Sequence, residues 1–225
     1  MRATQPGQSA LLLRDVVDVL TAQGVDDAVL GAMAMSVHGV VRASLDANAV
    51  TLIRLAEADL LAKRLPAAGL SADLRRGDPE DPIAGLLAIE DLHGNRVDLR
   101  VGLAGLRREA LDRARSVTFQ GIGLRVLTRE DVVATKLFAG GPQDIVDAAA
   151  TLRADPEGPD LALLRSAVEP FGREARERLD RLLKIGLGAD GGADEVTRHA
   201  ARGSVPVRGT RTHARGADGV ALPCN

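Results

Sequence analysis

The sequence predicts a mixed α/β fold of the α+β type, in which helices flank a mixed sheet and the C-terminal half is mainly helical. Three observations favour this class. Strand-like and helix-like segments alternate through residues 1–104, and apolar residues recur at helical spacing through most of residues 105–185. The chain has 225 residues, 45% of them apolar, which fits one soluble domain or one and a half. We therefore expect a core over residues 1–104 and a helical part over 105–185 packed on it.

The first half of the chain supplies most of the expected strands. Residues 27–30 form a strand candidate that turns at Gly31, and residues 45–54 alternate in polarity, which puts Asp46 and Asn48 on one face of a half-buried strand. The segment His93-Gly94-Asn95 is typical of a hairpin turn. We expect helices over 11–23, 32–37 and 56–68, and strands over 27–30, 45–54, 70–75, 83–90 and 96–103.

The second half reads as a series of helices that contains a single strand. Helices are expected over 106–115, 129–139, 143–153, 161–170 and 173–185, and the strand over 121–127. Residues 186–225 have a different character, with eight glycines, no aromatic residue and few large apolar side chains. Such a segment buries too little apolar surface to order itself, so we expect a disordered tail.

Composition excludes several classes of protein. The formal net charge is −2, which gives no bulk attraction to nucleic acid or to an anionic membrane. Cys224 is the single cysteine, so no internal disulfide framework or thiolate metal cluster can form. No run of about 20 apolar residues is present that could cross a bilayer. We expect a cytoplasmic protein without a membrane partner.

Oxygen-bearing side chains on two expected strands point to a metal site. Asp46 and Asn48 lie two residues apart and project side by side. Asp98 interrupts an apolar run, where a neighbouring strand is expected. Oxygen ligands of this kind suit Mg²⁺, which takes part of its coordination shell from substrate phosphates. These residues could equally be ordinary solvated strand residues.

A glycine turn precedes the acidic strand. A turn such as Gly31-Ala32 exposes backbone N–H groups at a helix start, which is one way in which proteins hold phosphate. Arg42, between the turn and the strand, is a candidate phosphate contact or a partner of a surface acid. His38 is expected to be a helix-end residue that makes a local hydrogen bond, and not a base or a ligand.

Three segments together resemble the minimal nucleotidyltransferase superfamily, especially the AbiEii-type toxins of toxin–antitoxin systems. The segments read L-G-A-M-A-M-S-V-H-G-V-V-R-A-S-L-D-A-N, R-V-D-L-R-V-G and L-T-R-E-D-V-V-A-T-K-L-F-A-G-G-P-Q-D-I-V-D. The resemblance covers about residues 11–155, and it implies a nucleotidyltransferase-like core over 1–104. It also implies roles for Ser44, Lys136 and Asp144, in addition to the residues above.

The resemblance implies transfer of a nucleoside monophosphate from an NTP to an acceptor hydroxyl, with release of pyrophosphate. Asp46, Asn48 and Asp98 would hold Mg²⁺ or Mn²⁺, and Asp98 is the candidate base. Asp144 would position the acceptor or a lysine. The phosphate-binding set would be Gly31, Ala32, Arg42, Ser44 and Lys136. RNA, in particular tRNA, is the favoured acceptor. A protein side chain and a small aminoglycoside-like hydroxyl are the alternative acceptors. The resemblance also implies an antitoxin protein as partner.

The sequence departs from the family pattern in ways that keep a second reading open. Asn48 stands where the family has an Asp, and an amide oxygen bridges two cations poorly. Ala32 replaces a Gly or Ser, and Gly141 stands where related sequences often have an Arg. The chain could therefore be a catalytically degenerate member that binds or regulates a partner. A structural helical adaptor built on the C-terminal half is a third possibility.

Overall fold

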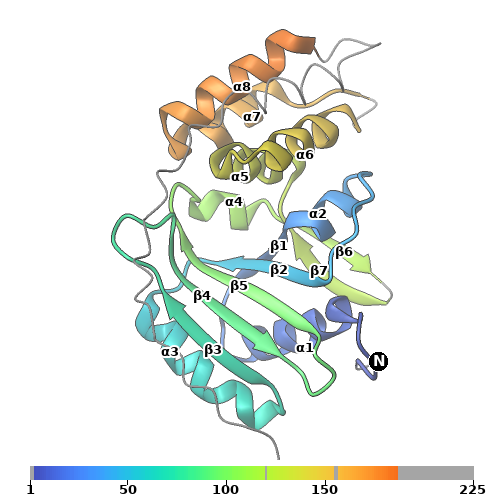
Figure 1. The fold of residues 1–225 in the computed structure, drawn as a ribbon, viewed down its shortest axis with the longest axis vertical. Helices are drawn as coiled ribbons and strands as arrows, with labels where there is room; N and C mark the ends of the chain where they lie inside the picture. Colours follow the sequence, from blue (N-terminus) through green and yellow to red (C-terminus); the bar gives the residue numbers. More distant parts are fainter. Residues whose placement is uncertain (1–2, 120, 155–156, 187–225) are drawn as a thin grey trace, which may run out of the picture.

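Among the residues that the structure describes, seven strands form one mixed sheet, and helices lie on both sides of it (Figure 1). The computed structural model describes residues 3–119, 121–154 and 157–186. The strands are β1 (Asp27–Leu30), β2 (Asp46–Thr51), β3 (Ser71–Arg76), β4 (Ile83–Glu90), β5 (Arg96–Leu103), β6 (Arg115–Phe119) and β7 (Ile122–Val126). Their order is β3-β4-β5-β2-β1-β7-β6. The β2–β5 and β1–β7 pairs are parallel, and the other pairs are antiparallel. The expected fold class, a mixed sheet flanked by helices, is confirmed.

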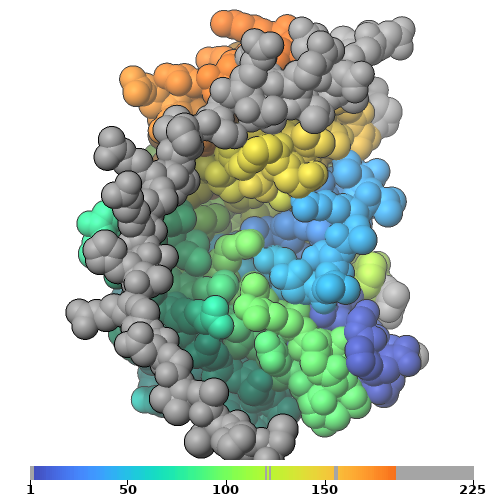
Figure 2. All heavy atoms as spheres, in the orientation of Figure 1, coloured from blue at the N-terminus to red at the C-terminus, as the bar shows by residue number. Residues whose placement is uncertain are grey.

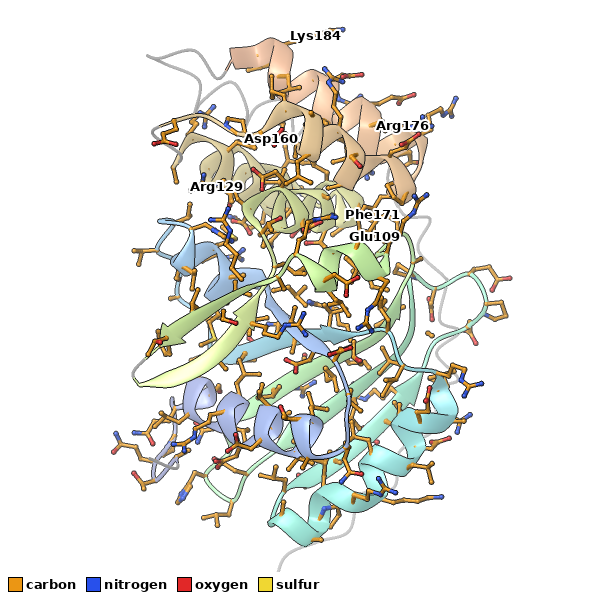
Figure 3. All side chains as sticks on the ribbon, turned by 180° about the vertical axis from the view of Figure 1, so that it is seen from behind. Glu109, Arg129, Asp160, Phe171, Arg176 and Lys184 are labelled. Carbon is orange, nitrogen blue, oxygen red and sulfur yellow. The ribbon has the colours of Figure 1, made fainter. Side chains whose placement is uncertain are left out.

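The helices fall into two groups. Helices α1 and α3 lie in front of the sheet when the molecule is seen from behind (Figure 3), and α5 to α8 stack beyond α2 and α4 at one end of the sheet (Figure 1). The bounds are α1 (Ser9–Ala22), α2 (Gly31–Val37), α3 (Leu55–Arg64), α4 (Arg108–Asp112), α5 (Arg129–Ala139), α6 (Pro142–Arg153), α7 (Leu161–Val168) and α8 (Arg173–Gly186). Two short 3₁₀ helices, Leu65–Ala68 and Glu169–Phe171, follow α3 and α7. No helix of the described residues is long and apolar enough to cross a membrane.

Buried and half-buried residues alternate along β5, and this alternation places the core on one face of the sheet and the polar residues on the other. Val97, Leu99 and Val101 are fully buried, and β5 contacts α1 and α3. The residues between them, Asp98 and Arg100, are half-buried on the opposite face. Because side chains of a strand point alternately to its two faces, one strand supplies both the core and the polar surface.

Two features of the second half differ from the sequence prediction. The helix expected over 106–115 is shorter, because α4 ends at Asp112, and residues 115–119 form β6, an edge strand that the prediction missed. Leu106, Ala110 and Leu111 are buried at helical spacing, and for this reason the helix was predicted to extend beyond Asp112. The sheet therefore draws strands from both sides of residue 104. The tail expected over 186–225 lies, from residue 187 on, outside the described residues.

Candidate active site

The turn between β1 and α2 lies directly against β2. Leu30 pairs with Asn48 in the antiparallel ladder, and Gly31 follows with a positive φ of 70°. A Cβ atom added to Gly31 would lie 3.4 Å from the Cβ atom of Asn48. Glycine adopts the left-handed conformation without the steric penalty that other residues incur. Gly31 thus lets the backbone turn sharply while it stays in contact with the Asn48 side chain.

The three predicted metal-ligating residues share one face of the sheet. In the parallel ladder of β2 and β5, Asn48 is paired with Asp98, and Asp46 lies two residues before Asn48. All three residues are half-buried, whereas Ala47 and Ala49, which flank Asn48 on β2, are buried. The pairing of adjacent strands therefore brings together residues that are 50 positions apart in the sequence.

Each carboxylate of this group already has a hydrogen-bond donor. The Ser44 hydroxyl donates to Oδ1 of Asp46 at 2.7 Å and to its backbone oxygen at 2.9 Å. Arg96 Nε donates to Oδ1 of Asp98 at 2.7 Å, and the Asp98 side chain is 15% exposed. Oδ2 of Asp98 makes no hydrogen bond within the described residues. These bonds fix the carboxylates while leaving oxygen atoms open to the solvent side.

A cavity of about 890 Å³ lies above this face, between the sheet and helices α5 and α6. Figure 2 shows the surface where residues of α2 and the following loop (light blue), β4 and β5 (green) and α5 and α6 (yellow) gather. The structure brings every predicted site residue to its wall: Gly31, Ala32, Arg42, Ser44, Asp46, Asn48, Asp98, Lys136 and Asp144. A cavity of this size is within the range that holds a small-molecule ligand such as a nucleotide.

Asp147 links the two cations of the cavity wall that come from outside the sheet. Lys136 Nζ donates to Oδ2 of Asp147 at 2.8 Å and to Oδ1 of Asp144 at 2.9 Å. Arg42 forms an ion pair with the same Oδ2 of Asp147, and Gln143 donates to Oδ1 at 2.9 Å. The Asp147 side chain is only 4% exposed. Buried charges need such partners, so the network holds Arg42 and Lys136 in fixed positions.

The sequence analysis did not select Asp147, although a signal was present. Asp147 follows Asp144 by three residues on α6, a spacing that puts both carboxylates on one helix face. Local sequence also explains where Lys136 lies. Helix α5 is capped at its start by Thr128, whose side chain accepts from the backbone N–H of Asp131, and at its end by Gly140 with a φ of 67°. Lys136 is therefore in the last turn of the helix.

Arg100 is a second wall residue that the sequence analysis did not select. It lies two residues after Asp98 on β5 and lines the same cavity. Burial lowers the pKa of its guanidinium, an effect that the nearby carboxylates of Asp98, Asp46 and Asp144 partly offset. Its presence beside the two strand carboxylates adds a positive charge at the floor of the cavity.

His38 links the end of α2 to the segment after β7. It ends α2, as predicted, and its Nε2 atom lies 2.8 Å from the backbone oxygen of Leu127. This hydrogen bond is long-range and not local as expected, because Leu127 follows β7 at the start of the connection to α5. Burial lowers the pKa of His38, and the hydrogen bond with Leu127 opposes this shift only in part.

The donor set of the cavity suits one hard cation. In the described part of the chain, no group of three or more His, Cys, Asp and Glu side chains could hold a metal ion by itself. Asp46, Asn48 and Asp98 offer two carboxylates and one amide oxygen on one face. Mg²⁺ binds through one or two carboxylates and completes its shell with water and substrate phosphates. The residues present therefore fit one Mg²⁺ bound together with a phosphorylated ligand.

Comparisons with known proteins give distant structural likenesses. No family model and no curated protein sequence matches the chain. An antigenic nucleotidyltransferase-like protein from Paracoccidioides brasiliensis is similar at 16% identity and a TM-score of 0.45, over 81% of this chain and 95% of that one. ANT(2")-Ia in complex with adenylyl-2"-tobramycin is similar at 14% identity and a TM-score of 0.42, over 79% and 97%. The Thermotoga maritima CCA-adding enzyme complexed with tRNA is similar at 19% identity and a TM-score of 0.40, over 86% of this chain and 50% of that one. Because all three TM-scores lie below 0.5, function has to follow from the residues of this chain.

Proposed function

We propose that the protein is a metal-dependent nucleotidyltransferase, which moves a nucleoside monophosphate from an NTP to an acceptor hydroxyl. One observation supports this most strongly. The parallel register of β2 and β5 pairs Asn48 with Asp98, and these residues and Asp46 line one cavity with the cations Arg42 and Lys136. A cation site next to fixed positive side chains matches the needs of a triphosphate whose α-phosphorus is attacked in line.

The metal site of this proposal consists of Asp46, Asn48 and Asp98. A bound Mg²⁺ or Mn²⁺ would neutralise phosphate charge and stabilise the charge that develops on the oxygens of the transferring group. Oδ2 of Asp98, which makes no hydrogen bond within the described residues, accepts the proton of the acceptor hydroxyl. The acceptor oxygen forms a bond to the α-phosphorus, and the bond from that phosphorus to the pyrophosphate oxygen breaks.

The phosphate tail lies, in this proposal, against Lys136 and Arg42. Both side chains are held in place by the buried Asp147, so no reorganisation of long side chains is needed when the nucleotide binds. Asp144 keeps Lys136 oriented through its 2.9 Å hydrogen bond. The backbone of Gly31 and Ala32 forms the opposite wall, and Ser44 positions Asp46.

For the acceptor we favour RNA, in particular tRNA, as the resemblance to the AbiEii-type toxins implies. Aromatic residues make up 1% of the chain, so base stacking contributes little, and contact with RNA would depend on arginine and phosphate. The same resemblance implies a toxin whose partner is an antitoxin protein. Expression of the chain alone in a bacterial host should then stop growth, and Asp46→Asn should relieve the arrest.

The enzymatic proposal is tested by pyrophosphate release. The purified chain is incubated with each NTP, Mg²⁺ or Mn²⁺, and bulk tRNA. Wild type should release pyrophosphate from at least one NTP, and Asp46→Asn and Asp98→Asn should each lower the rate about 10²-fold or more. Arg75→Gln is a matched control, because Arg75 is an exposed residue of β3, outside the cavity and paired with Asp73. Equal rates for wild type and Asp46→Asn would contradict the proposal.

A second function is favoured by a specific residue. Asn48 stands where a third carboxylate would be, which supports a catalytically degenerate chain that binds nucleotide and regulates a partner. Asn48→Asp separates the two functions, because restoring the carboxylate should raise the transfer rate of an active enzyme. If wild type and Asn48→Asp both release no pyrophosphate from any NTP, yet both bind NTP in calorimetry, the regulatory function holds.

A further inference from the structure

The cross-strand neighbours of Arg100 give this residue no partner of opposite charge. In the sheet, Arg100 is paired with Val50 on β2 and with Leu86 on β4. Arg96, four residues earlier on the same face, is paired instead with the acidic residues Asp46 and Glu90. The directly paired residues of Arg96 are therefore acidic, and those of Arg100 are apolar. The carboxylates near Arg100, those of Asp98, Asp46 and Asp144, form no ion pair or hydrogen bond with it in the described residues.

Arg100 also differs from the other cations of the cavity wall. Arg42 and Lys136 are ion-paired with Asp147, whereas Arg100 forms no ion pair or hydrogen bond in the part of the chain that the structure describes. Its side chain is half-buried, so part of its hydration is lost without a hydrogen bond from the described residues in exchange. A guanidinium in this situation is a ready binding group for a phosphate oxygen, which it can hold through two parallel N–H donors.

We propose that Arg100 binds a phosphate of the nucleotide and takes the place of a second divalent cation. This inference rests on the proposed nucleotidyl transfer. Two-metal sites hold their ions with carboxylates shared between them, and Asn48 replaces such a carboxylate. Asp46, Asn48, Asp98 and Arg100 together carry a net charge of −1, which suits one Mg²⁺ and not two. The absence of a carboxylate at position 48 and the presence of a guanidinium at position 100 thus act in the same direction.

In this proposal the metal ion and the Arg100 guanidinium bind the nucleotide in different ways. The single metal ion would be held by the strand carboxylates and the nucleotide, and Arg100 meets the phosphate on the Asp98 side of the cavity floor. Because the guanidinium belongs to the chain, its charge is in place before the nucleotide arrives. The chain then binds one divalent cation per nucleotide complex.

The experiment counts metal ions and measures nucleotide affinity without turnover. Mn²⁺ is titrated into the full chain with an α,β-methylene NTP analogue, bound Mn²⁺ is counted by electron paramagnetic resonance, and analogue affinity is measured by calorimetry. Wild type should bind one Mn²⁺. Arg100→Gln should bind the analogue about tenfold more weakly, as expected for the loss of one charge-assisted contact. Asn48→Asp combined with Arg100→Gln should bind two Mn²⁺, and Arg75→Gln should behave as wild type.

Turnover supplies the second readout. Arg100→Gln should lower kcat about 10²-fold, and Arg100→Lys should restore part of that loss because it keeps the charge but not the paired donors. Two Mn²⁺ bound by wild type, or an analogue affinity of Arg100→Gln equal to that of wild type, would overturn the role of Arg100. A wild-type chain that binds the analogue but transfers nothing refutes the proposed function alone, since the binding change of Arg100→Gln is still measured.

Discussion

Asp27 provides the sharpest test of the electrostatics of this fold. It is the first residue of β1, at the end of the strand opposite to Gly31, and only 5% of its surface is exposed. Its Oδ2 atom is buried and has no hydrogen-bond partner among the described residues. Burial raises the pKa of Asp27 to about 6, Arg125 opposes this rise, and Asp26 adds to it. The folded chain therefore holds a proton on Asp27 at a pH where the unfolded chain has lost it.

The sign and size of the effect follow from this difference in pKa. The unfolded value is 3.8, so between about pH 4 and 6 the folded state binds more protons and stability falls as the pH rises. A rise of about two units corresponds to about 3 kcal/mol, all of it lost above pH 6. Asp27→Asn removes the ionisation, so at pH 7.5 the variant should be about 3 kcal/mol more stable than wild type. Near pH 4 the two should be nearly equal.

Urea unfolding followed by circular dichroism at a series of pH values from 4 to 8 measures this effect. Asp18→Asn is the control, because Asp18 is an exposed acid of α1 that pairs with Arg14 at a side-chain exposure of 70% and is not among the groups that shift the pKa of Asp27. The control should lose at most about 1 kcal/mol at pH 7.5, as partly exposed ion pairs contribute little. Equal slopes of stability against pH for wild type and Asp27→Asn would refute the reasoning.

Three further substitutions test the site and its supports. Asp147→Asn leaves Arg42 without its carboxylate and Lys136 with Asp144 alone, so it should cost about 1 to 3 kcal/mol in urea unfolding and raise the KM for NTP. An unchanged KM would contradict the role of the network. Gly31→Ala imposes a positive φ on a residue with a Cβ atom, so the same assay should show a loss of about 1 to 2 kcal/mol in stability. Gly121→Ala is the control, because Gly121 also has a positive φ but no atom within 4 Å of an added Cβ. It should cost the same backbone strain without disturbing Asn48 or NTP binding. His38→Gln should remove the fall in stability that wild type shows as the pH drops below 6.5, because burial lowers the pKa of His38 and the unfolded chain then binds the extra proton. A wild-type stability that is flat between pH 5 and 7 after correction for Asp27 would exclude this effect.

The sequence allowed much of the sheet to be predicted because its strands have strong local signals. The strands over 83–90 and 96–103 match β4 and β5 residue for residue, since alternation and the turn at Gly94 determine both ends. Strand β6 was missed because a helical apolar spacing runs into it from the preceding residues. Its edge position is not the reason, since β3 at the other edge of the sheet was predicted.

The site was predictable where its residues are close in sequence and not where they meet through the fold. Asp46 and Asn48 could be placed on one face from their spacing alone. The ion pair between Arg42 and Asp147 joins residues 105 positions apart, and no local pattern indicates it. Arg100 shares its face with Asp98, but only the pairing with Val50 and Leu86 reveals that its cross-strand neighbours are apolar.

The charges of the cavity finally bear on how a triphosphate can enter it. Arg42 and Lys136 are balanced by Asp144 and Asp147, so this group presents little net charge to a ligand. The remaining wall has one positive side chain, Arg100, and more acidic ones: the two strand carboxylates and the exposed Glu80 and Asp81 of the loop before β4. This part of the wall is therefore negative. A triphosphate is repelled by such a wall unless a divalent cation accompanies it. NTP affinity measured by calorimetry should thus fall at least tenfold, about 1.4 kcal/mol, when EDTA replaces Mg²⁺. Equal affinity in EDTA would mean that the fixed cations alone hold the nucleotide and that the strand carboxylates play no part in its binding.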